Sequence, residues 1–311
     1  MEFGRVPVLD LIDFSLPPEP AENAAVLSGG APLNSPARPG NGPRVYLGCA
    51  KWGRKEWIGK IYPQGTKESE FLDYYVRHYN CIELNATHYK IYTPAEIKKW
   101  ADKAAGKDFL FCPKFPQQIS HYSSLTGIDG LTDAFLDGIL AFKDHLGPIF
   151  LQVSERFGPN RKEQLFSYLR SLPTDLSFFL EVRHPAWFSD PAENKALFHI
   201  LKDLGIGAVI TDTAGRRDCA HMHLTTPRTF IRYVGNSLHA TDYTRIDGWV
   251  ERMRHWLDKG IEDIYFFMHM HNEATSPELT VYLADKLNAA CGLSLIKPRF
   301  INGSAGQASL F

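Results

Sequence analysis

Three ionisable side chains are crowded into the end of one apolar run. In "FFLEVRHPAWF" (178–188), Glu181, Arg183 and His184 close a run that opens with three apolar residues, and Pro185 stops it. A carboxylate, a guanidinium and an imidazole can transfer protons, hold an anion or coordinate a metal. Because burying unpaired charge is costly, we expect these groups to pair around a shared polar cavity.

Polar side chains also end the other apolar runs of the chain. They are Lys51, Trp52, Glu83, Asn85, His88, Tyr89, Lys114, Gln152, Asp212, Arg232, His269 and His271. The beginnings of the same runs carry few such groups. A two-residue spacing places both members of a pair on one strand face, as for Glu83 with Asn85 and for His269 with His271.

Eight short apolar runs must position these side chains. They span 45–50, 81–85, 108–114, 149–154, 178–183, 207–212, 229–234 and 264–269. Continuous apolar runs are typical of strands that are covered on both faces, and amphipathic segments separate most of them. Between the sixth and seventh runs, residues 213–228 show no such amphipathic pattern and are predicted to form an irregular loop.

This alternation predicts a single-domain (β/α)₈ TIM barrel, in which the carboxyl ends of the strands form the site. An open doubly wound sheet is the alternative, but "GCAKWG" after the first strand lacks the expected G-x-G-x-x-G. We divide the chain into an extension or tether (1–43), the barrel (44–292) and a C-terminal tail (293–311). The extension holds eight prolines and five glycines, a composition that disfavours helix and strand.

Charge and cysteine content narrow the classes of partner. The net charge is −1, so no overall positive field favours nucleic acid or an anionic membrane. No apolar stretch is long enough for a membrane span, and the N-terminus lacks the features of a signal peptide. Five cysteines without a C-x-x-C spacing are typical of a reducing compartment. We therefore expect a cytoplasmic protein that has no contact with a membrane.

From about Tyr46 to Gly292 the chain resembles the YecE-like (DUF72) family of bacterial proteins of unknown function. The matching motifs are "GCAKWGRKEWIGKIYP", "YYVRHYNCIELNATHY", "FCPKFPQQISH", "LGPIFLQVSERF", "LEVRHPAWF" and, more loosely, "TFIRYVGN". The resemblance implies a TIM-type barrel and no defined activity. The chain departs from the family pattern in "RYVGN" and in "FMHMHNE". His269 and His271 lie in the second of these segments.

The resemblance also implies a set of pocket residues. They are Glu83, Asn85, Tyr89, Lys114, His121, Gln152, Glu181, Arg183, His184, Trp187 and Arg232. The resemblance, together with the positions at the strand ends, predicts Glu83, Glu181 and His184 as catalytic residues. The predicted ligand-binding residues are Trp52, Asn85, Tyr89, Lys114, His121, Gln152, Arg183, Trp187, Asp212 and Arg232.

Acid–base chemistry on a small anionic or polyhydroxylated ligand, such as one that contains phosphate or sugar, is the favoured function. The two glutamates would exchange protons if their pKa values were separated, and the basic residues would hold the anion. Hydrolase or isomerase activity is the expected class.

Two alternatives remain open. A divalent metal is the first, with His269, His271 and carboxylates as its ligands. A barrel that binds a ligand or a nucleic acid without catalysis is the second, and nucleic acid is not favoured. The cofactor is unknown.

Overall fold

Eight parallel strands form the centre of the protein. The computed structural model describes residues 3–28 and 42–301. The strands are β1 (Arg44–Cys49), β2 (Cys81–Leu84), β3 (Leu110–Pro113), β4 (Ile149–Gln152), β5 (Phe178–Glu181), β6 (Gly207–Asp212), β7 (Arg228–Gly235) and β8 (Asp263–Met270). They are hydrogen-bonded in the order β3-β2-β1-β8-β7-β6-β5-β4.

The sheet nearly closes on itself between β3 and β4. Isolated parallel bridges join Phe111 to Leu146 and Lys114 to Phe150 at this seam. The TIM-type α/β barrel predicted from the sequence is therefore confirmed, and the open doubly wound sheet is not.

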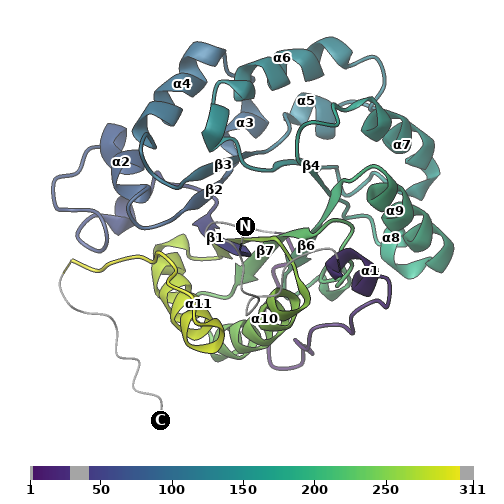
Figure 1. Ribbon diagram of the computed structural model, residues 1–311. Helices are drawn as coiled ribbons and strands as arrows, with labels where there is room; N and C mark the ends of the chain where they lie inside the picture. Colours follow the sequence, from purple (N-terminus) through teal and green to yellow (C-terminus); the bar gives the residue numbers. More distant parts are fainter. Residues whose placement is uncertain (1–2, 29–41, 302–311) are drawn as a thin grey trace.

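Helices surround the barrel (Figure 1). They are α1 (Asn23–Leu27), α2 (Phe71–Tyr75), α3 (Ala86–Tyr89), α4 (Pro94–Lys103), α5 (Gln117–Ser120), α6 (Asp129–Leu140), α7 (Lys162–Ser171), α8 (Ala186–Ser189), α9 (Pro191–Asp203), α10 (Ala240–Lys259) and α11 (Ser276–Cys291). Short 3₁₀ turns are η1 (Lys55–Trp57), η2 (Glu68–Glu70), η3 (Lys143–His145), η4 (Pro159–Arg161), η5 (Arg217–Cys219) and η6 (Glu273–Thr275). None of the helices in the described ranges is both long enough and apolar enough to cross a bilayer.

Two layers of side chains fill the inside of the barrel. The lower layer is an apolar cluster of Tyr46, Cys81, Cys112, Phe150, Phe179, Val209, Phe230, Tyr265 and Phe267. Along seven of the described strands the residue two positions later, on the strand or directly after it, is polar, giving Glu83, Lys114, Gln152, Glu181, Thr211, Arg232 and His269. Because side chains alternate between strand faces, these residues also point inward. The polar layer therefore lies above a buried, mostly aromatic apolar layer.

The N-terminal segment covers the wall where a helix between β6 and β7 would lie. Between these strands the chain forms only η5 and loop. Asn23 Nδ2 donates to the Met222 carbonyl (2.7 Å), and Leu224 N donates to Asn23 Oδ1 (2.9 Å). Helix α1 lies against α10 (Figure 1). Residues 3–28 thus complete the outer layer of the barrel at this point. Of the predicted extension 1–43 and tail 293–311, residues 1–2, 29–41 and 302–311 lie outside the described residues.

Candidate functional site

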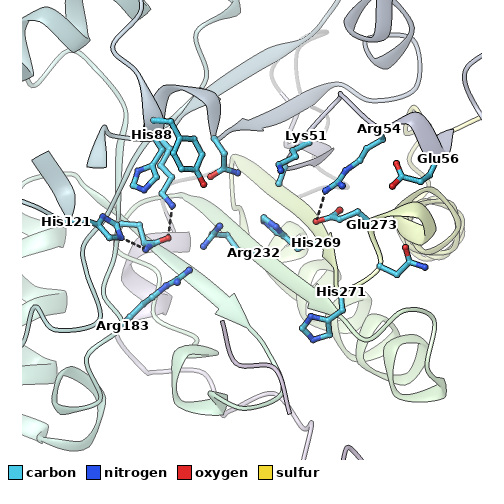
Figure 2. A pocket seen from close by; sticks show the side chains of 16 residues that line it. Lys51, Arg54, Glu56, His88, His121, Arg183, Arg232, His269, His271 and Glu273 are labelled. Atoms are coloured by element: carbon cyan, nitrogen blue, oxygen red, sulfur yellow. Dashed lines mark hydrogen bonds and ion pairs between the residues drawn. The ribbon is translucent and has the colours of Figure 1, made fainter. Parts of the chain in front are cut away.

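A cavity of about 570 Å³ opens at the carboxyl ends of the strands. Figure 2 shows its side chains converging from several strands and loops. The lining residues are Ala50, Lys51, Arg54, Glu56, Asn85, His88, Tyr89, Lys114, His121, Gln152, Arg183, Arg232, His269, His271, Asn272 and Glu273.

A buried network of alternating charges forms the floor of this cavity. Arg232 donates from Nε and Nη2 to the two oxygens of Glu83, each at 2.8 Å, and from Nη1 to Glu181 Oε2 at 2.7 Å. Arg183 Nε donates to the other oxygen of Glu181 at 2.6 Å. Two carboxylates and two guanidiniums from β2, β5, β7 and the loop after β5 thus neutralise one another in a place with almost no solvent contact.

Both glutamates are ionised at neutral pH. Burial by itself would raise the pKa of Glu83, but the charges of Arg232 and His269 outweigh burial and hold the pKa well below its usual value. Burial also opposes ionisation of Glu181, yet Arg183, Arg232 and Lys114 lower its pKa to about 2. Neither carboxyl carries a proton that it could donate.

Lys114, directly after β3, has a neutral partner. Its Nζ donates to Gln152 Oε1 at 2.9 Å, and among the described residues no carboxylate oxygen lies within 4.0 Å of it. Burial, and then the charge of Arg232, lowers the pKa of Lys114 to about 7. The amine therefore exists in both protonation states near neutral pH.

Two neutral imidazoles stand beside Lys114. Burial, followed by the charge of Lys114, lowers the pKa of His88 and of His121 to about 4. His88 Nδ1 lies 2.9 Å from the Phe115 carbonyl, so the hydrogen is assigned to Nδ1 and Nε2 keeps its lone pair. The His121 ring packs edge-on against His88, with 4.9 Å between the centroids.

Most of the remaining predicted residues lie in or beside the cavity. Asn85 Nδ2 donates to Glu83 Oε1 at 2.8 Å. His269 Nε2 lies 2.9 Å from Glu83 Oε2, and His271 lines the rim. Tyr89 is 67% exposed, and together with Trp52 it lines a smaller hollow of about 290 Å³ that shares residues with the main cavity.

Trp187 and His184 do not line the cavity. Trp187 is fully buried, and its Nε1 donates to the Phe157 carbonyl at 2.8 Å. His184 Nδ1 accepts from the backbone of Ala186 at 3.2 Å within the turn that leads into α8.

Asp212 points out of the barrel instead of into it. On β6 the residues Val209 and Thr211 share the inward face, so the alternation places Asp212 on the outer face. It pairs with Arg217 and Arg245, and it accepts from Trp249 Nε1 at 2.7 Å. Asp212 therefore fastens α10 to the barrel, and we leave it out of the candidate site together with Trp187 and His184.

The donors present do not suit the predicted metal site. Within residues 3–28 and 42–301, no three His, Cys, Asp or Glu side chains are grouped so that they could hold a metal ion. Glu83, the carboxylate next to His269, is occupied by Arg232 in a two-point pair. The pairing with arginine thus takes the oxygens that a metal would need.

The sequence reasoning missed several residues that come from loops. Arg54 and Glu56 follow β1, and Asn272 and Glu273 follow β8. Arg54 and Glu273 approach each other at 3.8 Å across the rim. Their only signal in the sequence is their place in loops after barrel strands, where site residues are common.

Comparisons with known proteins agree with this architecture. The family model described as "Protein of unknown function DUF72" matches residues 46–299. The chain is 29% identical over 261 residues to UPF0759 protein YecE of Escherichia coli K12, which covers 78% of this chain and 92% of that protein. It is also 29% identical over 164 residues to UPF0759 protein YunF of Bacillus subtilis, with 49% and 55% covered.

Solved structures show the same fold. A DUF72 family protein of Enterococcus faecalis V583 superimposes with a TM-score of 0.63 at 16% identity, covering 82% of this chain and 98% of that one. A DUF72 family protein of Thermotoga maritima gives 0.56 at 22% identity, with 73% and 92% covered. The family match over most of the chain is decisive, and this protein belongs to the DUF72 family.

Proposed function

We propose that the protein is an enzyme that binds a small ligand through a phosphate or carboxylate group and acts on it by acid–base chemistry at Lys114. The observation that carries the proposal is a buried amine with no carboxylate partner among the described residues, next to two arginines that face the same cavity. This constellation stands at the carboxyl ends of the strands, where barrel enzymes place their sites.

The anion half of the proposal rests on unused hydrogen-bond donors. A guanidinium has five N–H groups, and Arg183 uses its Nε for Glu181 while its Nη1 is 4.0 Å from Glu155. The Nη groups of Arg183 therefore remain available to phosphate or carboxylate oxygens, which suit this planar fork. The Phe3 ring lies 3.8 Å from Arg183 Cζ and limits the positions of the guanidinium from its other side.

The acid–base half rests on Lys114 and the two imidazoles. An acid or base is most effective when its pKa is near the working pH, and the pKa of Lys114 is lowered to about 7. His88 and His121 are neutral and can accept a proton. In this proposal Glu83 and Glu181 orient the arginines. This role differs from the catalytic role that the sequence predicted for the two glutamates.

The adjoining hollow supplies a place for the rest of the ligand. Trp52 and Tyr89 provide aromatic faces there, and such faces stack on sugar rings or bases. The ligand class is therefore an anionic head with an uncharged, partly apolar or hydroxylated body. We also propose a cytoplasmic location, because all five cysteines are free thiols.

Sulfate provides a direct test, because it keeps its charge across the relevant pH range. Calorimetric titration of the full chain with sulfate is expected to show binding that weakens as the pH rises above 7, where Lys114 loses its proton. Arg183→Met should weaken sulfate binding more than about tenfold, the effect of removing one charge-assisted contact.

Arg156→Met is the matched control, because Arg156 is exposed and does not line the cavity. It should bind sulfate as the unchanged protein does. Equal sulfate affinity in the Arg183 and Arg156 variants, or no sulfate binding at any pH, would contradict the proposed anion site.

A further inference from the structure

We propose that Lys114 forms a Schiff base with the carbonyl group of an aldehyde or ketone that also carries a phosphate or carboxylate. The inference rests on the proposed anion site and names the reactive class of its substrate. It begins from the position of Nζ, which lines the cavity while the side chain as a whole is only 7% exposed.

A nucleophilic amine must be unprotonated, and the surroundings of Lys114 favour that state. Charged groups face it from β2, β5, β7 and the loop after β5, and they are Glu83, Glu181, Arg232 and Arg183. The neutral rings of His88 and His121 lie beside them. Burial lowers the pKa of Lys114 most, Arg232 lowers it next, and the two glutamates oppose them, with a result of about 7. A substantial fraction of the amine is then free at pH 7, against roughly one part in 2,500 for an ordinary lysine.

The partner of Nζ also matters. Gln152 Oε1 accepts one N–H bond from Nζ at 2.9 Å, and this bond positions the amine. An amide oxygen is uncharged, so it stabilises the ammonium form less than a carboxylate would. The bond therefore orients the amine towards the cavity without forcing it to keep a third proton.

Each bond and proton can be followed through the formation of a Schiff base at Lys114. The lone pair of Nζ adds to the carbonyl carbon, and one nitrogen proton passes to the carbonyl oxygen, which becomes a hydroxyl. The second nitrogen proton passes to this hydroxyl, which leaves as water, and a C=N bond replaces the C=O bond; the imine nitrogen then takes up a proton from water. Nε2 of His88, which carries a lone pair, can take the proton from nitrogen and return it to the departing hydroxyl.

The resulting imine directs the chemistry that follows. A protonated C=N bond withdraws electrons from the neighbouring carbon, as in other enzymes that use lysine with carbonyl substrates. Proton removal or carbon–carbon bond cleavage next to the carbonyl would be eased. Isomerase or lyase reactions therefore suit this site better than simple hydrolysis.

Pyridoxal 5′-phosphate is a suitable probe, because it joins an aldehyde to a phosphate. The full chain is treated with a small excess of this probe at pH 7, reduced with borohydride, and mapped by peptide mass spectrometry. Lys114 should be labelled at least about tenfold faster than Lys51, an exposed lysine at the same rim. The preference should shrink towards pH 10, where a substantial fraction of ordinary lysines is also unprotonated.

Two further measurements separate the Schiff-base role of Lys114 from the anion site. One uses pyridoxal, which lacks the phosphate, and the other repeats the labelling in the presence of sulfate. Labelling of Lys114 that sulfate suppresses, and that is much weaker with pyridoxal, supports the inference. Sulfate binding without preferred labelling of Lys114, or labelling mainly at Lys51, overturns the Schiff-base role and leaves the anion site standing. Equal labelling by both aldehydes with no effect of sulfate overturns the anion site, and with it the anionic substrate.

Lys114→Arg provides a second measurement. Arginine keeps a positive charge but is not a nucleophile at this pH, so sulfate binding should persist while the fast labelling disappears and only the slow labelling of Lys51 remains. Fast borohydride-stable labelling of cavity peptides in this variant would contradict the assignment. Because the decisive labelling is done on the unchanged protein, the test does not depend on the stability of the variant.

Discussion

Glu83→Gln is expected to destabilise the protein strongly, because Glu83 is the acceptor at the centre of the buried network. Its side chain has no solvent exposure, and it accepts from Arg232 twice, from Asn85 and from His269. Glutamine has the same shape but removes the charge, and its amide hydrogens would face the donors of Arg232. Arg232 would then retain only Glu181 as a charged partner.

The magnitude follows from what remains after the substitution. Removing one member of a buried ion pair costs about 3–5 kcal/mol, because an uncompensated charge stays buried. Glu181, at 2.7 Å from Arg232, still compensates part of the charge of Arg232. We therefore expect a loss of stability in the lower half of this range. Urea unfolding followed by circular dichroism measures the difference.

Glu56→Gln is the matched control, since Glu56 is exposed at the rim of the same cavity. Exposed substitutions of this kind usually change stability by less than about 0.5 kcal/mol. The double variant Glu83→Gln, Arg232→Met should lose less than the sum of the two single variants, because the first change removes the partner that the second would orphan.

The effect of Glu83→Gln should also depend on pH in one direction. The pKa of Glu83 is held well below its usual value in the folded protein, so ionised Glu83 contributes stability above the pKa of the unfolded chain, about 4.3. That contribution is lost as the pH falls through the folded-state pKa. The free energies of unfolding of the unchanged protein and of the variant should therefore approach each other as the pH falls. A variant as stable as Glu56→Gln at pH 7, or a gap that grows in acid, would refute the reasoning.

Two further substitutions test the parts of the fold that position the site. Gly48→Ala should cost more than about 2 kcal/mol in urea unfolding, because the added Cβ would lie 2.3 Å from a backbone carbonyl oxygen of β2; an unchanged midpoint would show that the two strands can separate. Asn23→Ala should cost about 1–3 kcal/mol, because the Met222 carbonyl loses its buried donor and the loop at 213–228 loses an acceptor. A loss no larger than that of exposed Ser28→Ala would mean that the N-terminal segment contributes little.

The alternation of apolar runs and amphipathic segments was sufficient to predict the barrel, because covered parallel strands have few other arrangements. The two-residue period was also sufficient to place Glu181 and Arg183 on one face, above Phe179. Local geometry alone decides this alternation. It therefore follows from the order of the residues once the strands are known.

Only the tertiary structure decided which of these residues share a site and in which state. Asp212 was assigned to the site by its position at a strand end, but the register of β6 turns it towards Arg245. Glu83 was expected to exchange protons, but Arg232, which is 149 residues away in the chain, keeps it ionised. The reactivity proposed for Lys114 likewise depends on burial and on charges from other strands. Desolvation and pairing act through space, so they are set by the closed barrel and not by neighbours in the sequence.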